Sequence, residues 1–143
     1  MYHFDIHVQA LPDVCHPGPP LTFDGVVWPT LSFPNAARPH GLATFDEALT
    51  ALERLPRMFV EPDGSFVWVT VEDDQRWQVD GNLFDRGDEL AYVQLSGHCP
   101  QAAFDQLLGC CGWPATRLIF QLSRAGVFVE ESVFRSLAER PPK

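Results

Sequence analysis

The chain has 143 residues, a formal net charge of -9 and 45% hydrophobic residues, which suits one folded domain with a substantial core. Lys143 is the only lysine, so the chain lacks the clustered positive charge that binds nucleic acid and anionic membranes. We therefore expect a single domain over residues 1–143, with no nucleic-acid partner and no membrane partner.

The expected location is the cytoplasm, because the first ten residues do not form a secretory leader and no apolar run is long enough to span a bilayer. The four cysteines are too few for a disulfide scaffold, and we expect free thiols.

The N-terminal third combines one regular strand with an irregular segment. Residues 2–9 alternate apolar and polar side chains, which predicts a half-buried strand. Residues 11–40 hold more than half of the 13 prolines together with several large apolar residues. We expect this Pro-rich segment to be mostly irregular, with short strands near residues 21–28 and 30–33, and to cover the body of the domain.

The rest of the chain predicts alternating helices and hairpins. A capping box at Thr44 and Glu47 opens a helix over residues 44–55, and Pro56 ends it. Hairpins are predicted from residues 57–61 with 65–72, and from 76–84 with 90–96, with the strand at 65–72 buried on both faces. A helix at 100–111, strands at 117–122 and 127–129, and a short helix at 130–140 follow.

This order of elements predicts an α+β domain with a mostly antiparallel sheet and two to three helices. The order strand, helix and hairpin occurs twice, which suggests the further hypothesis of two weakly similar βαββ units. Two such units would share one sheet with the helices on one face, and the other face would then have to be covered by the Pro-rich segment, by a partner or by a ligand.

One candidate metal site lies on the first strand. His3, Asp5 and His7 alternate with apolar residues and therefore share one face, and imidazole and carboxylate are ligands for Zn²⁺ or Fe²⁺. The same spacing is expected of the wet face of any amphipathic strand, so the alternative interpretation is that these three residues are merely solvated.

Cys/His dipeptides form a second candidate. Cys15 with His16 and His98 with Cys99 supply four ligands of the kind that hold structural zinc, although the usual two-residue gaps are missing. Cys99 also precedes a predicted helix, which is a position that can lower a thiol pKa and make a nucleophile. The alternative for both is that they are ordinary loop and cap residues.

Two functional hypotheses remain, and the sequence leaves open whether the protein is an enzyme. The first is a non-catalytic acidic binding domain for a protein partner or a second copy, with Trp28, His98 and Cys99 as candidate binding residues and Trp77 and Trp113 as further exposed aromatics. It requires no cofactor. The alternative is a small metal-dependent enzyme or metal-binding domain using Zn or Fe at His3, Asp5 and His7, with help from His98 or Cys99, and it requires that the polar face of the first strand is enclosed.

Overall fold

A computed structural model of the chain describes residues 1–34, 41–72 and 75–139. Nine strands form one entirely antiparallel sheet in the order β2-β5-β11-β10-β1-β9-β8-β7-β6, and β3 and β4 form a separate two-stranded hairpin. The strands are β1 (Tyr2–Ala10), β2 (His16–Pro17), β3 (Leu21–Phe23), β4 (Val26–Trp28), β5 (Leu31–Ser32), β6 (Met58–Val60), β7 (Ser65–Glu72), β8 (Gln75–Arg86), β9 (Glu89–Cys99), β10 (Leu118–Leu122) and β11 (Phe128–Glu130).

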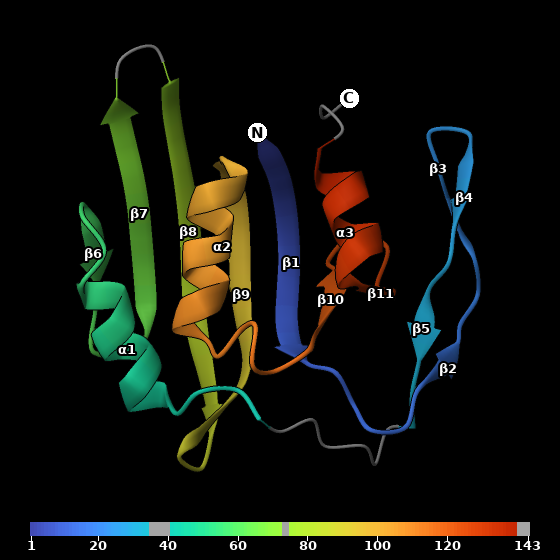
Figure 1. Cartoon of the computed structure of the whole chain (residues 1–143), viewed down its shortest axis with the longest axis horizontal. Helices are drawn as coiled ribbons and strands as arrows, with labels where there is room; N and C mark the ends of the chain where they lie inside the picture. Colours follow the sequence, from blue (N-terminus) through green and yellow to red (C-terminus); the bar gives the residue numbers. More distant parts are fainter. Residues whose placement is uncertain (35–40, 73–74, 140–143) are drawn as a thin grey trace.

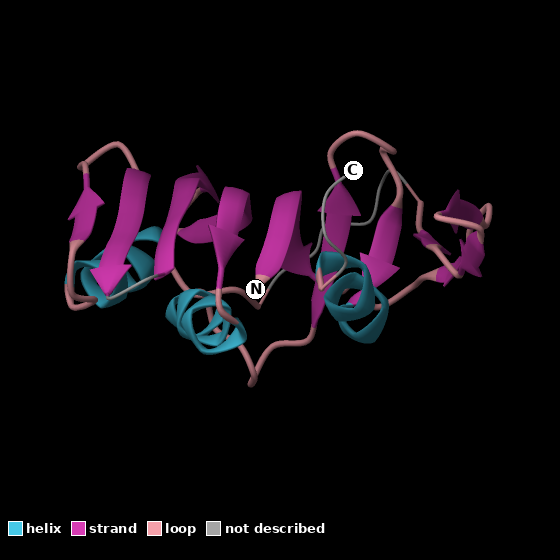
Figure 2. Ribbon diagram, turned by 90° about the horizontal axis from the view of Figure 1, so that it is seen from above, coloured by secondary structure: helices cyan, strands magenta, loops and turns pink. Residues whose placement is uncertain are grey.

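The helices are α1 (Phe45–Glu53), α2 (Gln101–Cys110) and α3 (Glu131–Ala138). All three lie on the same side of the sheet (Figure 2). The expected α+β class and the large antiparallel sheet with three helices are therefore confirmed. None of these described helices has the length and apolar character needed to cross a membrane.

Local sequence signals explain where the helices begin. In α1 the Thr44 hydroxyl accepts a hydrogen bond from the Glu47 amide at 3.1 Å, and the Glu47 carboxylate accepts one from the Thr44 amide at 3.0 Å. The predicted capping box is therefore present, and these bonds lower the pKa of the Glu47 carboxyl. Pro100 occupies the N-cap position of α2, where its missing N–H is not needed.

The core lies between the helices and the sheet. Strand β1 contributes its apolar face, in which Tyr2, Phe4 and Ile6 are buried. The helices contribute a stack of rings in which Phe104 of α2 lies 5.3 Å from Phe134 of α3. Because β1 is the central strand of this layer, its opposite face carries the polar residues of the same segment.

Two glycines let neighbouring elements approach β8 and β9 closely. A Cβ atom on Gly81 would lie 2.0 Å from the Phe66 ring, and one on Gly97 would lie 2.1 Å from the Gln78 carbonyl oxygen. Gly97 also has a φ angle of +135°, which side-chain-bearing residues rarely adopt. The sheet therefore requires glycine at the residue just before His98.

The face of the sheet opposite the helices is called here the helix-free face. On it, Val67 and Val69 of β7 are half-buried, whereas Phe66 and Trp68 on the helix side are buried. The prediction that β7 is buried on both faces is therefore wrong for these residues, because none of the helices in the described ranges lies over this side of the sheet (Figure 2).

The described part of the Pro-rich segment, residues 11–34, extends the sheet sideways through β2 and β5 and then projects as the β3–β4 hairpin (Figure 1). The short strands expected there are confirmed. Residues 35–40 lie outside the described part of the chain, so the covering role of the whole segment stays a prediction.

The repeated order of elements does not extend to the positions of the strands. In the first half, α1 is followed by β6, β7 and β8, and it is β8, the third of these strands, that lies next to β9. In the second half, α2 is followed by β10, and this first strand lies next to β1. The hypothesis of two βαββ units is not confirmed.

Candidate functional site

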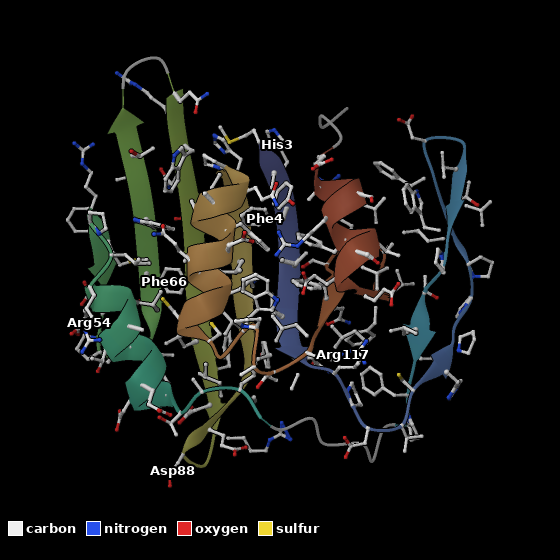
Figure 3. All side chains as sticks on the ribbon, in the orientation of Figure 1. His3, Phe4, Arg54, Phe66, Asp88 and Arg117 are labelled. Atoms are coloured by element: carbon white, nitrogen blue, oxygen red, sulfur yellow. The ribbon has the colours of Figure 1, made fainter. Side chains whose placement is uncertain are left out.

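The candidate site is an apolar groove between the β3–β4 hairpin and the body of the domain. Its volume is about 330 Å³. It lies at the N-terminal end of β1, where Figure 3 places His3 and Phe4. The residues lining it come from β1, β3, the β10–β11 turn and α3: His3, Phe4, Asp5, Ile6, Leu21, Phe23, Leu122, Ser123, Arg124, Ala125, Phe134, Leu137 and Ala138.

The groove exists because β1 is longer than its neighbour β10. Strand β9 pairs with β1 from Tyr2 to Val8, but β10 pairs with it only from Ile6 to Ala10. The chain leaves β10 at Ser123, whose amide donates to the Asp5 carbonyl at 3.1 Å, and then turns back into β11. The first residues of β1 therefore extend beyond the end of β10, and α3 covers the space from the helix side.

The hairpin that forms the other wall is called here the arm and comprises residues 18–30. Its turn is Asp24-Gly25, with φ angles of +56° and +76°, as a type I′ hairpin turn requires. At its base the Gly18 amide donates to the Thr30 carbonyl at 3.0 Å, and the buried Thr30 hydroxyl donates to the Pro19 carbonyl at 2.6 Å. These bonds fix where the arm leaves the sheet.

The arm has one strongly apolar face. Leu21 pairs with Trp28 and Phe23 pairs with Val26, so these four side chains lie on the same side of the hairpin. Leu21 and Phe23 line the groove, and Trp28 packs against the core. Nearer the tip, Phe23 and Val26 keep 41% and 38% of their surface exposed. Large apolar side chains are thus left in water beside an apolar groove.

The opposite face of the arm also carries an exposed apolar residue, but this residue points away from the groove. Val27 pairs with Thr22 and is 64% exposed. It is not among the residues that line the groove. The two faces of one hairpin therefore offer an internal comparison between a groove-facing and an outward-facing apolar residue.

The predicted metal ligands lie on the helix-free face, as the strand pattern requires, but their neighbours come from other strands. The His3 ring stacks on the His98 ring of β9, with centroids 5.6 Å apart, and the His7 ring lies 5.1 Å from the Tyr92 ring. Asp5 is exposed and faces Ser96 across the strand pair. Burial lowers the pKa of His3, and the charges of His98 and the N-terminal amine lower it further.

The described residues include no group of three or more His, Cys, Asp or Glu side chains arranged to hold a metal ion. The zinc hypothesis that joined Cys15 and His16 to His98 and Cys99 is wrong. Strand β2 lies five strand positions from β9, which corresponds to about 24 Å at the usual strand spacing. His98 and Cys99 also point to opposite faces, because neighbours in a strand alternate.

Cys99 does not have the environment of a nucleophile. Its side chain is buried on the helix side of β9, and burial raises the pKa of its thiol to about 12. The expected lowering of this pKa at a helix start is therefore wrong, because loss of water outweighs the helix terminus. All four cysteines are free.

The candidate binding residues do not converge. Trp28 belongs to the arm, His98 to the helix-free face and Cys99 to the core. Trp77 and Trp113 are half-buried, with Trp77 packed against Trp68 and Trp113 donating to the Glu131 carboxylate at 2.8 Å. Sequence reasoning missed Phe23 and Val26 as exposed residues, although the Asp24-Gly25 turn between two apolar pairs indicates a hairpin.

The groove carries few polar groups. No hydrogen bond or ion pair joins the side chains of His3, Asp5 and Ser123 in the part of the chain described. A groove of this kind is suited to holding apolar side chains.

Comparison of the chain with family models, curated proteins and solved structures finds no match in any of the three.

Proposed function

We propose that this chain is a non-catalytic protein-binding domain of the cytoplasm, and that the groove between the arm and the body holds an extended segment of a partner protein. One observation carries the proposal: Phe23 and Val26 are exposed on the side of the arm that faces an apolar groove of about 330 Å³. Exposed apolar residues gathered beside a groove are typical of binding sites.

The low stability of an isolated hairpin and the free edges of the arm support binding of a partner segment. A two-stranded hairpin is at best marginally stable in water, and a third strand or an apolar contact is needed to stabilise it. Peptides commonly bind by adding a strand to an exposed edge while alternate side chains enter pockets. Both strands of the arm have an outer edge, because among the strands that the structure describes β3 and β4 pair only with each other.

Charge indicates what kind of segment fits. The chain as a whole has a net charge of -9, although at the groove the exposed Asp5 is offset by the exposed Arg124. Two copies of this chain would therefore repel each other, whereas a segment with Lys or Arg beside its apolar residues would be attracted. We infer an apolar, cationic segment of a different protein as the occupant, and expect the free chain to be a monomer.

The test uses peptides selected from a random display library on the folded protein. Their affinities are then measured by calorimetry for the wild type and two arm variants, Phe23→Ser and Val27→Ser. We expect selected peptides to combine alternating apolar residues with Lys or Arg, and to lose at least about tenfold in affinity with Phe23→Ser, which equals about 1.4 kcal/mol. Val27→Ser is the matched control, because it removes a more exposed apolar residue from the opposite face of the same hairpin.

Equal affinities for the wild type and Phe23→Ser would place the binding elsewhere and contradict the proposal. A dimer in light scattering that Phe23→Ser converts to a monomer would replace the foreign partner by a second copy.

A further inference from the structure

Two histidines from different strands face each other on the helix-free face. His3 of β1 is paired directly with His98 of β9, and their rings stack with an angle of 11° between the planes. Both side chains are half-buried, so one side of the pair remains open to solvent. The two strands are adjacent in the middle of the sheet, which holds their backbones at a fixed spacing.

The separation of the rings suits a chelated ion. A Zn–N bond is about 2.0–2.1 Å long, so each ring centroid lies about 3 Å from a bound zinc, and a tetrahedral angle places the two centroids about 5 Å apart. The observed separation is 5.6 Å. The rings only have to turn about their Cβ–Cγ bonds to direct a nitrogen at one ion, and this torsion has broad energy wells.

His7 is differently placed, since its ring packs against Tyr92 and it faces Gln94 across the strand pair. It also lies four residues from His3 along β1, which corresponds to about 13 Å.

We propose that His3 and His98 together bind Zn²⁺ on the helix-free face, with water completing the coordination. This site differs from the set suggested by the sequence pattern, in which His3, Asp5 and His7 were the main ligands and His98 or Cys99 a helper. It does not depend on the proposed protein-binding function, because neither the arm nor a partner supplies a ligand, although His3 also lines the groove and His98 does not.

The experiment is a titration of the full chain with Zn²⁺, followed by NMR of the histidine ring protons. In the wild type, the signals of His3 and His98 should shift together with one apparent affinity. His98→Asn should reduce the association constant at least about tenfold, because the second imidazole acts at a high effective concentration. His7→Asn is the matched control and should leave the affinity within about twofold.

A result in which His7→Asn weakens binding while His98→Asn does not would overturn the proposal in favour of the single-strand set. Independent weak shifts of every histidine in the wild type would also overturn it, and this measurement does not rely on any variant folding. Loss of peptide binding in Phe23→Ser with an unchanged zinc titration would separate the two proposals.

Discussion

Arg135 of α3 makes polar contacts with α2, with its own helix and with the central strand β1. Its guanidinium lies 2.8 Å from an Asp105 carboxylate oxygen on α2 and 3.0 Å from the Glu131 carboxylate, and it donates to the Tyr2 hydroxyl at 3.3 Å. It also lies 5.4 Å from the centre of the Trp113 ring. Burial lowers its pKa, but the Tyr2 hydroxyl and the Asp105 carboxylate raise the pKa overall, so the group stays charged.

Replacing Arg135 by Met keeps the apolar stem and removes the charge. The two carboxylates are about one-third exposed, so each ion pair contributes about 1 kcal/mol, less than a fully buried pair would, and the cation–ring contacts add about 1 kcal/mol. The expected loss is about 3 kcal/mol in the free energy of unfolding. For a domain of this size that lowers Tm by roughly 10 °C.

Urea denaturation and thermal melting followed by circular dichroism measure this loss. A double-mutant cycle with Asp105→Asn should give a coupling energy of about 1 kcal/mol. Arg124→Met removes an exposed arginine and serves as the control, with an expected change below about 0.5 kcal/mol. The reasoning is refuted if Arg135→Met costs no more than this control.

Three further predictions follow from single sites. Gly97→Ala should cost at least about 2 kcal/mol by urea denaturation, because its Cβ meets the Gln78 carbonyl and its φ is strained; an unchanged midpoint would contradict this. Burial raises the pKa of the Cys99 thiol to about 12, so at pH 8 a thiol reagent should react quickly only with half-exposed Cys15; a second fast thiol would be inconsistent. Burial is the main cause that lowers the pKa of His3 below 6.5 in the folded state. The contribution of His3 to the free energy of unfolding is therefore complete above pH 6.5 and is lost as the pH falls through the folded-state pKa. His3→Gln should reduce the loss of Tm between pH 7.5 and pH 5.5, and an identical loss in the wild type and the variant would refute the assignment.

Most of the secondary structure could be predicted from the sequence, because its signals are local. The capping box at Thr44 and Glu47 and the stop at Pro56 place α1 at Phe45–Glu53. The two-residue alternation of β1 places its apolar side chains in the core and His3 on the other face. These features depend on neighbours a few residues apart, and periodicity and backbone sterics decide them.

The neighbours of each strand were decided only by the tertiary structure. The sequence grouped His3 with Asp5 and His7 because they share one strand, but the position of β1 between β9 and β10 sets His3 against His98, 95 residues away in the chain. The same long-range pairing ends β10 at Leu122, beyond which the groove forms. Strand order depends on which distant apolar faces pack together, and no local pattern encodes it. The sequence therefore suggested His98 or Cys99 as a helper of the β1 residues, but only the strand pairing places His98 opposite His3 and Cys99 on the other face.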